Sequence, residues 1–229
     1  MLTRAALNAR LDGAFERTLT TVVAAPGFGK STTLAEWAAD RPVAWLAVGP
    51  LDAAPSHLLS SLIAAIGPHV PRLPPELASA AVGSLGPDAE ADEGERAQAS
   101  GLLLCAALEE RLTHELVLVL DDCHQLSPAA ARLVETICRA APRRLHLLLA
   151  SRSQVPFSTA RLQSHGQAAD IGASELAFSV DEVRELLSVE LGEHDEVHAA
   201  AVHRVTGGWA AVVRLGIEAM RSCPSGNRA

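Results

Sequence analysis

The sequence contains no tyrosine, and aromatic residues make up only 3% of its 229 residues. A core built from this chain must therefore consist mainly of leucine, valine, isoleucine and alanine side chains. The hydrophobic share of 48% is sufficient for such a core without disulfides or metals. A chain of this length corresponds to one domain, or to one domain with a small appendage.

Three further scarcities exclude whole classes of protein. Acidic residues outnumber basic ones by 27 to 19, and the net charge of −8 argues against a broad electrostatic surface for DNA or RNA. The hydrophobic runs fall far short of a membrane span, and charged residues fill the N-terminal segment where a signal peptide would be apolar. The four cysteines form no Cys-x-x-Cys pair, which is typical of reduced, mostly buried thiols. We therefore expect a cytoplasmic protein without direct contact to nucleic acid or membrane.

Lysine occurs once, at Lys30, in a chain that otherwise uses arginine as its basic residue. A compact, mobile ammonium suits a phosphate chain better than a planar guanidinium does. The lysine stands in the sequence AAPGFGKS, and Gly-x-Gly-Lys-Ser after an apolar run is the core of a phosphate-binding loop, or Walker A motif. Nucleotide binding is therefore the first functional prediction.

Short apolar segments alternate with helical patterns along most of the chain. Strands are expected at 19–25, 43–48, 115–120 and 145–151, with a weak strand near 168–172. Helices are expected at 31–40, 56–66, 101–112 and 128–141, and then at 180–191, 196–205 and 209–221. This alternation predicts an α/β fold in three layers, with a parallel sheet of about five strands and right-handed crossovers.

The same pattern divides the chain into parts. We expect a core over residues 1–174, a small helical lid over 175–221 and a polar tail over 222–229. Within the core, residues 67–99 combine several prolines with the acidic run PDAEADEGER. We interpret this stretch as one short helix plus a flexible, solvated insertion.

The loop chemistry follows from its place between a strand and a helix. Unpaired backbone N–H groups at the helix N-terminus, together with the positive end of the helix dipole, attract phosphate oxygens. Gly27 and Gly29 allow the backbone to turn these groups inward. Lys30 would reach the β- and γ-phosphates, and the Ser31 hydroxyl would ligate Mg²⁺. The expected nucleotide-binding residues are Ala24, Ala25, Pro26, Gly27, Phe28, Gly29, Lys30, Ser31 and Thr32.

The full loop pattern has glycine at the position of Ala24, so a glycine-rich turn with a chance Lys-Ser is the competing interpretation. A second element supports the site: the apolar strand at 115–120 ends in Asp121 and Asp122. Asp121 would hold the metal through a water, and Asp122 would orient or deprotonate the attacking water. An Asp pair after a strand is also common as a plain turn or helix cap.

The third element is the strand at 145–151, which Arg152 follows. If this strand lies between the loop strand and the aspartate strand, a polar group at its tip can sense the γ-phosphate. Arg152 is therefore the candidate sensor, and an ordinary solvated surface arginine is the alternative.

Taken in order, these elements resemble a known family. The chain is similar to the nucleotide-binding module of STAND-class, AAA-like P-loop ATPases, in particular of the MalT-like group of large LuxR-type transcriptional regulators. The opening segment 2–11 also resembles the stretch that precedes the loop in that group. The matching segments are VAAPGFGKSTTLAEW (23–37), PVAWL (42–46), LVLDDCHQL (118–126), HLLLASRS (146–153), LAFSVDEVRELL (176–187) and TGGWAA (206–211).

The resemblance implies a P-loop fold and a switch that binds ATP or ADP with Mg²⁺, hydrolyses ATP slowly and changes its association with the bound nucleotide. It implies a phosphate site at Gly27, Gly29, Lys30 and Ser31, a metal carboxylate at Asp121, a catalytic carboxylate at Asp122 (Walker B) and a sensor at Arg152. Arg4 would border the adenine, and Trp209 would pack in the lid core. In that family the position of Ala24 is commonly not glycine.

Regulators of that family continue into a helix-turn-helix, whereas this sequence contains no DNA-reading element. We therefore expect a stand-alone module, a fragment or a decayed relative. We expect it to act with protein partners or by self-association. A module that binds partners independently of nucleotide, and a small-molecule kinase on the same loop, remain as alternative functions.

Overall fold

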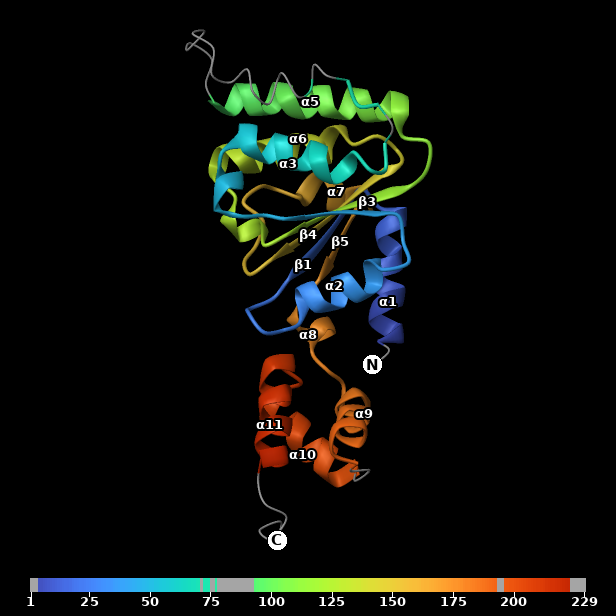
Figure 1. Ribbon diagram of the computed structural model, residues 1–229, viewed down its shortest axis with the longest axis vertical. Helices are drawn as coiled ribbons and strands as arrows, with labels where there is room; N and C mark the ends of the chain where they lie inside the picture. Colours follow the sequence, from blue (N-terminus) through green and yellow to red (C-terminus); the bar gives the residue numbers. More distant parts are fainter. Residues whose placement is uncertain (1–3, 71, 75–76, 78–92, 193–195, 223–229) are drawn as a thin grey trace.

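The computed structural model describes residues 4–70, 72–74, 77, 93–192 and 196–222, and its centre is a five-stranded sheet (Figure 1). The strand order is β2-β3-β4-β1-β5, and every neighbouring pair is parallel. The strands are β1 (Leu19–Val23), β2 (Val43–Ala47), β3 (Leu116–Asp121), β4 (Leu145–Ser151) and β5 (Ala168–Ile171). The predicted α/β class with about five parallel strands is confirmed, and β4 lies between β1 and β3 as the sensor argument requires.

The two central strands are buried along their whole length, which explains their continuous apolar sequence. Successive side chains point to opposite faces. On β3, Leu116, Leu118 and Leu120 belong to the larger hydrophobic cluster, whereas Val117 and Val119 belong to the cluster on the other face. The sheet is therefore the middle of three layers.

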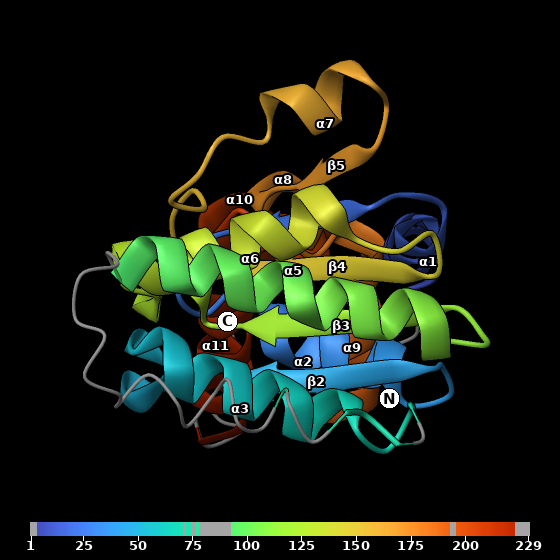
Figure 2. The same ribbon diagram turned by 90° about the horizontal axis from the view of Figure 1, so that it is seen from above.

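Helices cover both faces, as Figures 1 and 2 show. On one face lie α3, α5 and α6; on the other lie α1 and α2. The helices α3 and α6 begin with proline at their first position, where the backbone N–H has no partner within the helix and its absence costs no hydrogen bond. Ser127 caps α6 by accepting a hydrogen bond from Ala130 N. The helices of the core are α1 (Ala5–Asp12), α2 (Lys30–Ala38), α3 (Pro55–Ile66), α5 (Glu93–Arg111), α6 (Pro128–Ala140), α7 (Ala160–Ser164) and α8 (Ala173–Leu176), with 3₁₀ turns η1 (Gly13–Glu16), η2 (Pro50–Ala53) and η4 (Cys123–Gln125).

The helix α5 corrects the predicted bounds of the insertion. It begins at Glu93, whereas the sequence pattern predicts the helix at 101–112 and one short helix plus a flexible insertion over 67–99. The buried side of its first half is formed by Gly94, Ala97 and Gly101, which lie against α6. Small residues let two helices approach closely but give little hydrophobic signal in the sequence. Acidic side chains in the first turn also favour a helix N-terminus, so the acidic run is partly helical. Residues 78–92 lie outside the described part of the chain.

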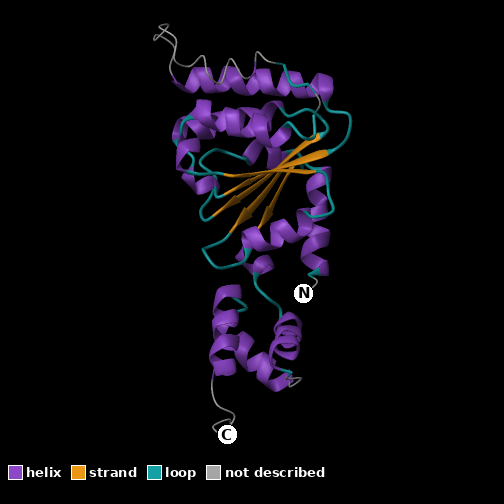
Figure 3. Ribbon diagram, viewed as in Figure 1, coloured by secondary structure: helices purple, strands orange, loops and turns teal. Residues whose placement is uncertain are grey.

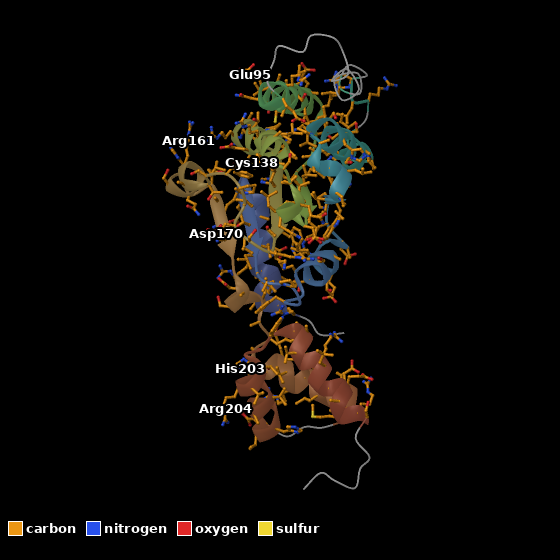
Figure 4. All side chains as sticks on the ribbon, turned by 90° about the vertical axis from the view of Figure 1, so that its left-hand side faces the viewer. Glu95, Cys138, Arg161, Asp170, His203 and Arg204 are labelled. Carbon is orange, nitrogen blue, oxygen red and sulfur yellow. The ribbon has the colours of Figure 1, made fainter. Side chains whose placement is uncertain are left out.

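The three cysteines in the described part of the chain agree with the expectation of buried thiols, and Cys223 lies outside it. Cys105, Cys123 and Cys138 are free and buried, and Figure 4 shows Cys138 in the helical half of the core. Burial raises the pKa of the Cys105 thiol to about 12, so this group stays protonated and unreactive at neutral pH. Among the described residues, no helix combines the length and apolarity needed to cross a bilayer.

The C-terminal helices form a separate bundle with its own small core (Figure 3). The bundle, here called the lid, consists of α9 (Val180–Leu191), α10 (Glu196–Thr206) and α11 (Ala210–Ser222). Ser179 caps α9 in a reciprocal arrangement with Glu182. Leu176 packs in the core of the sheet domain, whereas Phe178 packs in the lid core. The chain therefore passes from one hydrophobic core to the other within two residues.

Candidate nucleotide-binding site

The predicted phosphate loop lies between the end of β1 at Val23 and the start of α2 at Lys30. Its glycines adopt left-handed backbone conformations, with φ of +82° at Gly27 and +78° at Gly29. Residues with a side chain rarely adopt these angles, which explains the glycines physically. Ala24 N donates to Ser151 O at 3.3 Å, so the loop starts against the tip of β4.

Lys30 lies inside this loop. Its side chain is only 7% exposed, and Nζ donates to Ala24 O at 2.6 Å and to Ala25 O at 3.2 Å. Burial lowers the pKa of the ammonium, and Arg152 lowers it further, while Asp121 and Asp122 oppose the shift. The lysine therefore lies within electrostatic reach of all three side chains that the sequence assigned to the same site.

The two aspartates occupy different environments at the end of β3. Asp121 is buried, and its Oδ1 accepts a hydrogen bond from Asp122 N at 2.9 Å. Asp122 adopts a left-handed backbone conformation with φ of +59°, and its side chain is partly exposed to solvent. Arg152 Nε lies 4.0 Å, and His124 Nδ1 3.6 Å, from Asp122 Oδ1. Side chains that follow three neighbouring parallel strands thus meet at one edge of the sheet.

Ser31 and Thr32 are exposed in the first turn of α2, beside the buried lysine. Ser31, in the first turn of α2, and Asp121, at the end of β3, offer a hydroxyl and a carboxylate oxygen. No group of three or more His, Cys, Asp or Glu side chains in the described residues forms a metal site of its own. Mg²⁺ usually takes one or two protein ligands and completes its shell with phosphate and water oxygens. The donor set therefore fits Mg²⁺ that arrives with a nucleotide.

A pocket of about 330 Å³ adjoins the loop and extends between the core and the lid. The core contributes Arg4 and the loop residues Gly27, Phe28 and Gly29, together with residues of α2. The lid contributes apolar side chains, two glutamates and one arginine. The lid residues that line it are Phe178, Glu185, Leu186, Val189, Glu190, Ala210, Ala211 and Arg214. Sequence patterns gave no sign of these lid residues, because only the fold brings α9 and α11 to the loop.

Arg4 lines the pocket, and its hydrogen bonds go to protein groups. Its guanidinium donates to Glu182 Oε1 at 2.9 Å and to the carbonyl oxygens of Leu176 and Ala177 at 3.0 and 2.9 Å. The same group lies 5.0 Å from the centre of the Phe178 ring. Arg4 thus links the segment before α1 to the lid.

Trp209 corrects a prediction, since it does not pack in the lid core. Its ring stacks on the ring of Phe28, with the ring centroids 5.7 Å apart and an angle of 15° between the ring planes. Its Nε1 donates a hydrogen bond to Pro26 O at 3.1 Å. The side chain remains 38% exposed. Gly207 and Gly208 form a left-handed turn before α11 that directs this tryptophan toward the loop. An aromatic residue between the two loop glycines was the only sequence signal for such a contact.

Comparison with known proteins agrees with this geometry. A family model described as an AAA ATPase domain matches residues 2–150. The HTH-type transcriptional regulator MalT of Cronobacter sakazakii is 29% identical over 220 residues, which cover 93% of this chain and 23% of the relative. MalT of Yersinia enterocolitica is 28% identical over 218 residues, which cover 91% of this chain and 22% of the relative. The chain thus spans less than a quarter of the length of these relatives.

Among solved structures, a Walker-type ATPase of Pyrococcus abyssi superposes with a TM-score of 0.54 at 15% identity, covering 97% of this chain and 68% of that one. At this identity the likeness concerns the fold alone, and it confirms the predicted P-loop fold. The family match covers more than half of the chain, and the MalT relatives extend over nearly all of it. This chain therefore belongs to the AAA ATPase domain family and is a MalT-like P-loop module.

Proposed function

We propose that this chain binds ATP with Mg²⁺, hydrolyses it slowly and acts as the nucleotide-dependent switch module of a MalT-like transcriptional regulator. One observation supports the proposal above others. Lys30, Asp121, Asp122 and Arg152 come from three separate strand ends and gather around one glycine-rich loop. A structural turn needs no such group of opposite charges at the carboxyl edge of a parallel sheet, where ligands of α/β folds bind.

The loop residues Ala24 to Thr32 would surround the phosphates. The N–H groups at the start of α2 would donate to phosphate oxygens, helped by the helix dipole. Lys30 at present bonds Ala24 O and Ala25 O, and its ammonium would exchange part of this contact for the β- and γ-phosphates. The partly desolvated charge gives a stronger interaction with an anion than an exposed one would.

The metal would be held by Ser31 and, through a water, by Asp121. Bound Mg²⁺ would neutralise charge on the phosphates. Asp121 is buried and fixed by the Asp122 N–H, so its carboxylate is already oriented. Asp122 is more accessible and would orient the attacking water and accept its proton. Arg152, beside Asp122, would contact the γ-phosphate and register its loss after hydrolysis.

The remainder of the nucleotide would occupy the pocket between the core and the lid. Its apolar lining of Phe28, Phe178, Leu186 and Val189 suits the faces of a base, and Arg4 and the lid acids stand at its border. A ligand in this place would contact both hydrophobic units. ATP and ADP would therefore favour different lid positions, which is the physical requirement for a switch.

The relatives are transcriptional regulators by name. We propose that the switch acts through protein partners or self-association, and that this acidic chain makes no direct contact with nucleic acid. We also propose the division expected from the sequence: a core over residues 1–174, a helical lid over 175–221 and a polar tail over 222–229.

Titration calorimetry with Mg-ATP tests the proposal. We expect binding by the wild-type chain and a loss of affinity of at least about tenfold in Lys30→Ala, since a charge-assisted contact to phosphate disappears. Asp122→Asn should retain binding and release phosphate more slowly. Arg161→Ala is the matched control, because it removes a positive charge from α7, which projects from the core away from the lid (Figure 4). The proposal would be contradicted if the wild-type chain shows no measurable Mg-ATP binding. It would also be contradicted if Lys30→Ala binds Mg-ATP with the affinity of the wild type. Phosphate transfer to an acceptor other than water would favour a kinase.

A further inference from the structure

The first four carbonyl groups of the phosphate loop, those of residues 24–27, all accept hydrogen bonds, and two of these bonds come from the lid. Lys30 Nζ donates to the carbonyls of Ala24 and Ala25. The next two carbonyls accept from the lid: Pro26 O from Trp209 Nε1 at 3.1 Å, and Gly27 O from Ala211 N at 2.9 Å. A loop that binds anions through its N–H groups must direct its carbonyls elsewhere. In this chain the lid holds two of them.

One of these two bonds holds Gly27, whose backbone has a large intrinsic conformational freedom. Glycine loses more conformational freedom on ordering than any other residue, so Gly27 needs external contacts to stay in one conformation. The stacking of Phe28 on Trp209 adds a third contact of the lid with the loop, at the residue that follows Gly27. Aromatic pairs and hydrogen bonds of this kind each contribute modestly, but all three depend on the position of one lid turn.

That turn is itself fixed at the junction of core and lid. Phe178 N donates to Gly208 O at 2.8 Å, and Gly208 N donates to Thr206 Oγ1 at 3.2 Å. A Cβ atom on Gly208 would lie 2.2 Å from Phe178 O, so only glycine fits at this crossing. A rotation of the lid about the Phe178 segment would therefore move Trp209 away from the loop.

We propose that Trp209 is a positioning residue of the phosphate loop: it fixes the loop in its anion-binding shape while the lid is docked, and so makes nucleotide affinity depend on lid position. This inference rests on the proposed function for its link to nucleotide, whereas the contact itself can be measured without any ligand. Trp209 lies outside the lid core, so its substitution leaves the buried residues of the lid in place.

The contact is tested first in the nucleotide-free, ¹⁵N-labelled chain. Its three tryptophans give three indole N–H resonances, and Trp209→Phe identifies one by its loss. We expect slow water exchange for the Trp209 indole and, in Phe28→Ala, a shift of this resonance with exchange at least about tenfold faster. Trp37, whose Nε1 donates to Asp12 Oδ1 at 2.8 Å, is an internal control that stays unchanged. If Phe28→Ala leaves the Trp209 resonance unmoved, the proposal is wrong.

Affinity for Mg-ATP is then compared by calorimetry among lid variants. Trp209→Ala should bind about tenfold more weakly than wild type, and Trp209→Phe should fall between them because it keeps a ring to stack on Phe28. Leu215→Ala, at an exposed position of α11, the helix that follows Trp209, should bind like wild type. Equal affinity of Trp209→Ala and wild type would overturn the proposal. A wild-type chain that shows the slowly exchanging indole but binds no Mg-ATP would overturn the proposed function instead, while supporting the loop-positioning contact.

Discussion

Gly27 lies in the phosphate loop and in contact with the lid, and both its backbone conformation and this contact require glycine. Its φ of +82° lies where a Cβ atom costs about 1–2 kcal/mol in L-residues. A Cβ atom built there would also lie 2.8 Å from Ala211 Cβ and 2.9 Å from Trp209 Nε1. Both neighbours belong to the lid. The position therefore requires glycine twice, once for the backbone and once for the close approach of the lid.

Gly27→Ala should displace the lid turn from the loop and weaken Mg-ATP binding by at least about tenfold, because the added methyl group breaks the contacts to Trp209 and Ala211. Calorimetry measures the affinity, and the fluorescence of the tryptophans reports the displaced ring. Gly166→Ala is the matched control: its φ of +69° produces the same backbone strain, but no atom lies within 4 Å of the new methyl group. That variant should lose about 1 kcal/mol of stability and keep its affinity. Equal affinities of the two variants would contradict this account.

At the scale of the elements, Asp52 fixes the segment between β2 and α3. This buried carboxylate accepts hydrogen bonds from Gly49 N at 2.8 Å and from Ser61 Oγ at 2.7 Å, and His57 Nδ1 lies 2.9 Å away. The segment in turn holds the turn after β3, since Ser127 Oγ donates to Ala53 O. Asp52 thus supports the edge of the sheet that bears the two site aspartates.

We predict that Asp52→Ala lowers the free energy of unfolding by about 1–3 kcal/mol at pH 7, because the variant leaves buried donors without their acceptor. Urea denaturation of the two proteins measures the difference. Glu110→Ala removes an exposed carboxylate that pairs with Arg111 and should cost less than about 1 kcal/mol.

The loss of unfolding free energy caused by Asp52→Ala should also depend on pH. Burial by itself would raise the pKa of Asp52, but the hydrogen bonds from Gly49 and Ser61 and the contact with His57 outweigh it and lower the pKa below the ordinary value. A carboxylate with a lowered folded-state pKa stabilises the fold above its unfolded pKa of about 3.9 and loses that contribution as the pH falls through the folded-state pKa. The difference between wild type and Asp52→Ala should therefore narrow below about pH 4. A constant difference from pH 7 to pH 3 would rule out the charged carboxylate as its source.

The elements show what the sequence alone can predict. The strand β4 and the helix α9 have the predicted bounds, because continuous apolar residues and a Ser-x-x-Glu cap are strong local signals. The start of α5 was missed because its buried positions are glycine and alanine. The convergence of Lys30, Asp121, Asp122 and Arg152 could be predicted, since each ends or follows a strand and parallel strands align their ends. The lid side of the pocket could not be predicted, because no local sequence pattern indicates where a separate helical bundle docks.

At the scale of the whole molecule, Arg4 connects the two hydrophobic units. It precedes α1, whose apolar residues pack in the core, and its guanidinium bonds Glu182 and two carbonyls at the base of the lid. Further described lid–core contacts lie at the phosphate loop, through Trp209 and Ala211. One link thus lies at the border of the proposed nucleotide pocket, and the other is made by the phosphate loop itself.

Arg4→Ala should therefore release the lid without unfolding either core. Hydrogen bonds to a charged group are worth about 1.5–3 kcal/mol, so the amides of α9 to α11 should exchange at least about tenfold faster while those of β3 and β4 stay protected. Arg10→Ala is the control, because that side chain is 54% exposed and its contacts with Asp170 and Glu175 are at 3.3–3.4 Å. Hydrogen exchange followed by mass spectrometry resolves these segments. If the lid exchanges alike in both variants, Arg4 is not the link.

Mg-ATP should restore the protection that Arg4→Ala removes, because a ligand that contacts both the loop and the lid binds the docked arrangement better than the open one. At a concentration 100 times its dissociation constant, such a ligand stabilises the docked state by up to about 2.7 kcal/mol, which is similar to the loss expected from the substitution. The same addition should not restore the lid in the Arg4→Ala, Lys30→Ala double variant, whose loop has lost its phosphate contact. Protection that returns equally in the single and double variants would mean that the nucleotide acts at some place other than this loop.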